Sequence, residues 1–226
     1  MDTLFQTNID VTEEQNIEFK ELVTKIGVWI NQKFFWVNDL YTSSPNMVAS
    51  YPLAVQLEVY KGKVEECNIC CVKLTIKNLA IISKSLKVYF QQETAVKIDD
   101  HVAYYGPNEQ SLVHWLNDRI YICNGKYKGK GIKQYTTKSG KQRRTPHLWS
   151  NLRKGHLLYR PISAKDVMSA ITLEETIGPH KRADIYYWII QSKQKGQAEK
   201  LNRLLQKTDW NSKLKSDIIL KSDLCL

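Results

Sequence analysis

No Asp or Glu occurs between Arg119 and Lys165, although this segment of 47 residues carries thirteen Lys and Arg. The formal net charge of the whole chain of 226 residues is +10, so the acid-free segment holds more than the entire excess of positive charge. A local field of one sign attracts polyanions. The first expectation is therefore an anionic partner.

Long apolar runs are also missing, since no stretch approaches the ~20 residues that a membrane-spanning helix needs. Residues 1–4 lack the basic start and apolar core of a signal peptide. The five cysteines are odd in number, with Cys67, Cys70 and Cys71 crowded together, which is unlike a disulfide framework. We expect a cytoplasmic protein without a membrane partner, and residues 141–144 leave nuclear import open as an alternative.

Motifs for nucleotide and cofactor chemistry are absent. The chain has no Gly-x-Gly-x-x-Gly after an expected strand, no P-loop, and no serine or cysteine in a nucleophile elbow beside its histidines. The pair Cys67 and Cys70 lacks the second cysteine pair that a structural zinc site requires. We expect no cofactor and no metal.

What the chain does have is enough apolar and aromatic material for a core. Hydrophobic residues make up 42% of it, with 6 Trp, 12 Tyr and 5 Phe, and a chain of this size folds without a covalent or metal staple. The expected fold class is α+β: a single domain over residues 1–226, with a mostly antiparallel sheet, a long N-terminal helix and a helical C-terminal region.

In the first half, apolar residues from Ile17 to Ile30 recur at three- and four-residue spacing, which predicts one helix over the first 40 residues. A hairpin over residues 54–60 and 64–76, turning at Gly62, should follow. The remaining expectations are strands at 86–90 and 95–98, a turn at 104–108, and a short helix at 111–116.

The second half contains the basic segment, which we expect to project as a hairpin and short helix within residues 119–160. Thr145 as N-cap, Pro146 and Gly155 predict a helix over 146–154. The other expected elements are a strand at 119–123, a hairpin at 132–144, helix from 163 to the Gly178 stop, a buried strand or alternatively a helix at 184–190, and helices at 197–207 and 211–221.

The predicted site is a nucleic-acid interface on this basic segment. Arg143 and Arg144 precede a helix N-terminus, which favours phosphate, and tyrosines interleaved with lysines are typical of single-strand binding, with Tyr127 and Tyr135 expected to be exposed. The candidate residues are Lys126, Tyr127, Lys128, Lys130, Lys133, Tyr135, Lys138, Lys141, Arg143, Arg144, His147, Arg153 and Lys154.

The function expected from these residues is nucleic-acid binding, with RNA slightly preferred over DNA because glycine-rich basic loops suit unpaired bases. A protein partner in a nucleoprotein complex is part of this expectation. Three alternatives stay open: a merely solvated basic face, a metal-dependent nuclease using Asp99, Asp100 or Glu58, and an adaptor that binds an acidic protein through the N-terminal helix.

Overall fold

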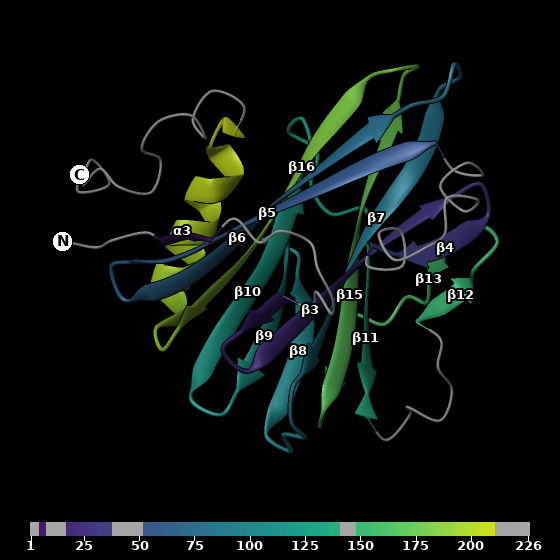
Figure 1. The fold of residues 1–226 in the computed structure, drawn as a ribbon. Helices are drawn as coiled ribbons and strands as arrows, with labels where there is room; N and C mark the ends of the chain where they lie inside the picture. The colour runs from purple at the N-terminus through teal and green to yellow at the C-terminus, as the bar shows by residue number, and fades with distance from the viewer. Residues whose placement is uncertain (1–4, 8–16, 38–51, 141–147, 211–226) are drawn as a thin grey trace.

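The structure, a computed structural model, describes residues 5–7, 17–37, 52–140 and 148–210. These residues form two antiparallel β-sheets packed face to face, with one helix against the outside of the larger sheet (Figure 1). The fold class is therefore a β-sandwich, and the expected α+β class with a long N-terminal helix and a helical C-terminal region is wrong.

Sheet A is the larger sheet and has eight strands. In spatial order they are β1 (Phe5–Thr7), β5 (Leu53–Val64), β6 (Cys67–Asn78), β16 (Arg182–Ser192), β10 (Arg119–Lys126), β9 (Ser111–Leu116), β8 (His101–Gly106) and β14 (Ile162–Ala164). Helix α3 (Lys195–Lys207) follows β16 directly and crosses the outer face of this sheet (Figure 1).

Sheet B is formed by the other long strands. In spatial order they are β11 (Gln134–Ser139), β15 (Val167–Ile177), β7 (Lys84–Thr94), β3 (Leu22–Ile30) and β2 (Ile17–Phe19), with β4 (Lys33–Trp36) also paired to β3. A separate pair, β12 (Trp149–Asn151) and β13 (His156–Leu157), lies within residues 148–158, which we call the outer hairpin.

The core lies between the two sheets and is made by alternate side chains of each strand. Phe90 of sheet B stacks on Tyr187 of sheet A, with ring centroids 4.3 Å apart. At Gly125 the sheets come close enough that a Cβ atom would lie 2.9 Å from Leu173 Cδ1. A larger residue at position 125 would therefore push the sheets apart.

Helix α3 covers only part of the outer face of sheet A. Its residues Ala198, Leu201 and Leu205 pack on a buried cluster that includes Trp188 of β16 and Trp210. Arg182 and Asp184, at the start of β16, lie beyond this cover, so one part of the face stays polar and open. Among the described residues, no helix is both long and apolar enough to cross a membrane.

The outer hairpin is fixed to the outer face of sheet B by side-chain hydrogen bonds. The carbonyl oxygen of Gly155 accepts from Tyr89 Oη at 2.7 Å and from Lys87 Nζ at 3.1 Å, and Trp29 Nε1 donates to the Leu152 carbonyl at 2.8 Å. Helix α3 and the outer hairpin therefore lie on opposite sides of the sandwich (Figure 1).

The N-terminal helix prediction is wrong for a physical reason. Residues 17–37 form β2, β3 and β4, and β3 is buried on both faces because the core covers one side and aromatic side chains cover the other. A strand covered on both faces reads as a nearly continuous apolar run, which also satisfies a helical spacing. The β-branched residues Val23, Ile26, Val28 and Ile30 favour the strand.

Three further helix predictions are also wrong. Residues 111–116 form β9, residues 167–177 form β15, and residues 148–154 contain β12 followed by turns. Each of these segments pairs with a neighbouring strand, and in the last two the pairing overrode local capping signals. The expected helix at 211–221 and the expected hairpin tip at 141–144 lie outside the described residues.

Other predictions are confirmed. The hairpin over 54–76 exists as β5 and β6, although it turns at residues 65–66 rather than at Gly62. The strands at 119–123 and 184–190 exist as parts of β10 and β16, and the helix at 197–207 exists as α3.

A chain of buried hydrogen bonds crosses the core. The amide of Val167 donates to His101 Nδ1, which requires His101 Nε2 to carry the proton that it shares with His114 Nδ1 at 2.8 Å. His114 Nε2 then donates to Ser169, and Ser169 donates to Gln92 Oε1. The chain joins strands of both sheets through two neutral imidazoles.

Acid should weaken the fold through these two histidines. Burial lowers the pKa of His101 to about 4 and also lowers that of His114. The unfolded chain therefore binds more protons below pH 6.5, and the free energy of unfolding should fall as the pH drops from 6.5 towards 4. Urea unfolding across this range should show that His101→Gln/His114→Gln flattens the slope between pH 6.5 and 5. The same slope should persist in His180→Gln, because His180 is exposed.

The outer hairpin depends on the glycine at position 155. Its φ is +61°, and a Cβ atom there would lie 2.7 Å from the Trp29 ring, whereas Gly129 has a φ of +78° with open space around it. Both Gly→Ala changes strain the backbone, but only Gly155→Ala adds a clash. Gly155→Ala should lower the free energy of unfolding by about 1–3 kcal/mol and by more than Gly129→Ala. Equal losses in the two variants would show that the Trp29 contact is unimportant.

Candidate functional site: a pocket at the end of helix α3

The predicted site residues do not form one surface. Lys126 ends β10 of sheet A and Lys128 lies in the turn after it, Lys138 lies on β11 in sheet B, and Arg153 and Lys154 lie in the outer hairpin. The two packed sheets separate Lys126 and Lys128 from Arg153 and Lys154. The remaining basic candidates within the described chain, Lys130 and Lys133, are exposed between β10 and β11, and Lys141, Arg143, Arg144 and His147 lie outside the described residues.

The two tyrosines expected to be exposed have other roles. Tyr127 is 3% exposed and belongs to the core between the sheets. Tyr135 stacks on Tyr105 with ring centroids 3.7 Å apart, and a hydrogen bond to Tyr159 together with burial raises its pKa to about 12. Lys138 is buried as well, and burial lowers its pKa, with a further contribution from Arg160.

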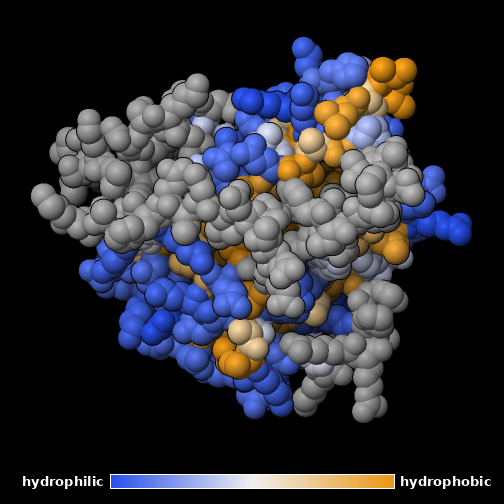
Figure 2. Space-filling model, in the orientation of Figure 1, coloured by the Kyte–Doolittle hydropathy of each residue, from blue (hydrophilic) through white to orange (hydrophobic). Residues whose placement is uncertain are grey.

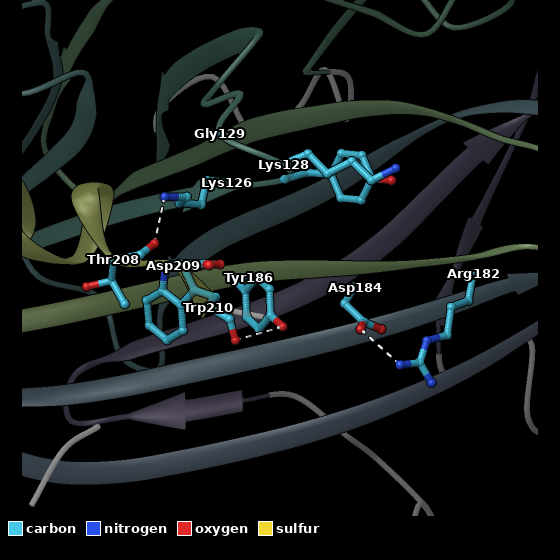
Figure 3. Close-up of a pocket in the computed structure, with 10 residues that line it drawn as sticks. Lys126, Lys128, Gly129, Arg182, Asp184, Tyr186, Thr208, Asp209 and Trp210 are labelled. Atoms are coloured by element: carbon cyan, nitrogen blue, oxygen red, sulfur yellow. Dashed lines mark hydrogen bonds and ion pairs between the residues drawn. The ribbon is translucent and has the colours of Figure 1, made fainter. Parts of the chain in front are cut away.

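A pocket of about 240 Å³ opens on the outer face of sheet A, where helix α3 ends (Figure 3). Three segments that are distant in sequence meet there: the end of β10 with its following turn, the start of β16, and the residues after α3. The lining residues are Lys126, Tyr127, Lys128, Gly129, Arg182, Asp184, Tyr186, Thr208, Asp209 and Trp210.

Lys126 closes the inner end of the pocket. It pairs with Tyr186 across β10 and β16, so its side chain leaves the sheet on the side of the helix. Its Nζ donates to the carbonyl oxygen of Gln206 at 2.6 Å and to that of Thr208 at 2.9 Å, the second of which is drawn in Figure 3. These carbonyls are left without helical partners at the C-terminus of α3. Burial lowers the pKa of Lys126, and Asp209 opposes this shift.

Two aromatic rings form the wall of the pocket. Tyr186 and Trp210 stack with ring centroids 5.1 Å apart, and both are almost fully buried. Burial is the largest cause that raises the pKa of Tyr186 to about 12. Their faces are already used in packing, so they shape the pocket instead of offering free stacking surfaces to a base.

The mouth of the pocket carries charges of both signs. Arg182 lies 3.7 Å from Asp184, which also accepts a hydrogen bond from Thr75 at 2.8 Å. The ammonium group of Lys128 lies 5.0 Å from the centre of the Tyr127 ring. Asp184 is thus already bonded by residues of the protein.

Cations of sheet A extend the positive charge beyond the pocket. Lys77 of β6 lies directly opposite Arg182 in the strand register, and Lys73 lies opposite Tyr186. Like charges directly opposite one another destabilise a sheet unless a counter-charge is bound. We call the group of five cations on and beside this part of the face the basic strip: Lys73, Lys77, Lys126, Lys128 and Arg182. Its exposed members are Lys77, Lys128 and Arg182.

The carboxylates near the basic strip already have hydrogen-bond or ion-pair partners within the protein. Glu58 accepts from Lys73 Nζ at 2.8 Å and from Tyr60 at 2.6 Å, and these bonds outweigh the effect of burial and lower the pKa of Glu58. Within the described chain, Lys77 has no carboxylate as an ion-pair partner. Its side chain is exposed on the outer face of sheet A.

Sequence reasoning missed Lys73, Lys77 and Arg182 because they lie outside the acid-free segment. One available signal was the alternation of Lys73, Thr75 and Lys77 along an expected strand, which places all three on one face. Their neighbour across the sheet, Arg182, comes from a strand more than a hundred residues later and could not be assigned without the register.

The acidic residues considered for a nuclease are not brought together. Glu58 lies on β5, whereas Asp99 and Asp100 precede β8, five strand spacings away in sheet A, or roughly 24 Å. Asp99 instead lies 3.6 Å from Lys97. The part of the chain that the structure describes contains no group of three or more His, Cys, Asp or Glu that could hold a metal ion.

The contact of Ser169 with His114 resembles a nucleophile and base but lacks the required protonation. Because the Val167 amide fixes the tautomer of His101, His114 presents an N–H to Ser169 and cannot accept its proton. Ser169 and His114 are both 0% exposed. The arrangement joins the sheets and is closed to a substrate.

Comparisons with known proteins leave the family open. No protein-family model and no curated protein matches the chain. A bacterial glucoamylase complexed with acarbose has a TM-score of 0.45 and 9% identity, over 84% of this chain and 29% of the glucoamylase chain. A candidate kojibiose phosphorylase from the human microbiome has a TM-score of 0.36 and 8% identity, over 83% of this chain and 25% of the other. The chain spans less than a third of either protein, and these scores are too low to support an argument about fold or activity.

Removing the Lys126 ammonium group should loosen the end of helix α3. In Lys126→Met the carbonyls of Gln206 and Thr208 lose their donor, which should lower the free energy of unfolding by about 1–3 kcal/mol. Urea unfolding followed by tryptophan fluorescence would measure this loss of stability, because Trp210 lies directly after the end of α3. Lys130→Met, at an exposed position, is the matched control. Equal stability in the two variants would contradict a role for Lys126 in holding the helix end.

Proposed function

We propose that the protein is a binding protein rather than an enzyme, and that it takes a phosphate-bearing polyanion on the basic strip of sheet A. The observation that carries the proposal is the cross-strand pair of Lys77 and Arg182, two exposed cations held opposite each other on the outer face of sheet A. Asp184, 3.7 Å from Arg182, offsets one of these charges. An anion that contacts both side chains would offset the charge that remains. Lys128, at the mouth of the adjoining pocket, extends the same surface.

Nucleic acid remains one member of this ligand class. Its backbone presents phosphates at regular spacing, and binding would depend steeply on salt because counterions are released. The buried rings of Tyr186 and Trp210 favour contacts with phosphate over stacking with bases. We therefore expect little preference among nucleic-acid sequences.

A non-catalytic role is supported by the separation of Glu58 from Asp99 and Asp100 in sheet A. The cytoplasmic location expected from the sequence is part of this proposal. The four cysteines in the described part of the chain, at positions 67, 70, 71 and 123, are free and buried, which fits a reducing compartment.

Two double variants of equal charge separate the basic strip from the segment predicted by sequence. Lys77→Ala/Arg182→Ala removes two cations from sheet A, and Arg153→Ala/Lys154→Ala removes two from the outer hairpin. Fluorescence anisotropy with labelled single-stranded RNA, at low and moderate salt, should show about tenfold weaker binding for the first pair, a change of about 1.4 kcal/mol. The second pair should bind nearly as well as the unchanged protein.

Competition with inorganic polyphosphate should displace the RNA, because the proposal rests on phosphate groups alone. A larger loss in Arg153→Ala/Lys154→Ala would favour the outer hairpin as the site. No binding of any probe at low salt would refute polyanion binding.

A further inference from the structure

One end of the sandwich exposes three aliphatic side chains on a single loop. Residues 79–83 connect β6 of sheet A to β7 of sheet B, and Leu79, Ile81 and Ile82 are 42%, 82% and 58% exposed. Figure 2 shows a hydrophobic tip projecting beyond hydrophilic side chains at the upper right, where this loop lies. We call residues 79–83 the apolar tip.

The apolar tip is held rigidly by a buried asparagine. Asn78 is 0% exposed, and its Nδ2 donates to the carbonyls of Ile82 at 2.8 Å and of Ile177 and Gly178 at 3.0 Å. Its Oδ1 accepts from the amide of Ala80 at 3.0 Å. The isoleucines are therefore presented by a fixed backbone, with their side chains turned away from the core.

Cations surround the apolar tip. Lys77 and Lys84 flank the loop, and the neighbouring β15–β16 turn contributes Lys181, whose carbonyl accepts a hydrogen bond from the amide of Asn78 at 2.9 Å. No Asp or Glu occurs in residues 67–92 or 176–183 of the sequence. The exposed end of the apolar tip is thus formed by aliphatic side chains, and the residues next to it carry positive charge.

We propose that the apolar tip docks the protein on an anionic lipid surface, with Ile81 and Ile82 inserted among the headgroups and the lysines near lipid phosphates. Apolar side chains that enter the interface and cations attracted to anionic lipids together give reversible peripheral binding. Lys77 belongs to both surfaces, but this inference can be tested apart from the proposed polyanion binding, because it rests on the aliphatic tip. It revises the sequence-based expectation of no membrane partner, which considered only spanning segments.

The shape of the apolar tip favours a lipid surface over a protein partner. A specific protein interface buries more than about 1,000 Å² in total, with closely fitted surfaces, whereas the tip is one short loop with three large side chains. A fluid bilayer closes around such a tip without requiring a matching surface. The surrounding lysines match the negative charge of anionic headgroups.

Co-sedimentation of the full chain with lipid vesicles tests the proposal. Vesicles of phosphatidylcholine mixed with phosphatidylserine should bind the protein, and vesicles of phosphatidylcholine alone should bind it much less. Ile81→Ser/Ile82→Ser should lower the partition coefficient about tenfold or more. The matched control is Val96→Ser/Ile162→Ser, two aliphatic residues that are 67% and 63% exposed elsewhere, and it should bind as the unchanged protein does.

The contribution of charge is tested by Lys84→Ala/Lys181→Ala against Arg153→Ala/Lys154→Ala, which removes the same charge from the outer hairpin. Only the first pair should weaken vesicle binding, by about tenfold. Absence of vesicle binding, or binding that Ile81→Ser/Ile82→Ser leaves unchanged, would overturn the proposal. Polyanion binding should survive Ile81→Ser/Ile82→Ser, so failure of this inference is distinguishable from failure of the proposed function.

Discussion

Strand β16 is buried on both of its faces, and the rest of the structure depends on this burial. From Ile185 to Ser192 every residue is buried, because one face of the strand packs in the core and the other lies under helix α3. The helix ends before it reaches the start of the strand, so Arg182 and Asp184 stay accessible. The pocket and the basic strip exist because the apolar cover is shorter than the sheet.

The two outer faces of the sandwich are covered by different elements. Helix α3, together with Trp210 after it, packs on part of sheet A. The outer hairpin packs Leu148 and Leu157 on part of sheet B and is also held by hydrogen bonds to the Leu152 and Gly155 carbonyls. Basic residues of a single acid-free segment are consequently distributed over both sides of the molecule. Basic residues that follow one another in the sequence therefore do not form one basic surface in this fold. The residues of a site are identified from the register that pairs the strands.

The sequence was sufficient to predict the elements whose hydrophobic pattern fits only one kind of secondary structure. The hairpin of β5 and β6 and helix α3 were predicted because alternation or amphipathic spacing was clear. The strands β3 and β15 were predicted as helix because burial on both faces removes the alternation that marks a strand. Of the candidate site, Lys126 and Lys128 were predicted, but Lys77 and Arg182 depend on a pairing between residues 105 positions apart in the chain.

The most direct measurement is lysine footprinting: brief acetylation of the protein with and without single-stranded RNA, followed by mass spectrometry of each modified lysine. If the basic strip holds the ligand, Lys77 and Lys128 should be protected by RNA, while Lys154 of the outer hairpin should react equally in both samples. Protection of Lys154 with no change at Lys77 and Lys128 would contradict the account and place the ligand on the opposite side of the sandwich.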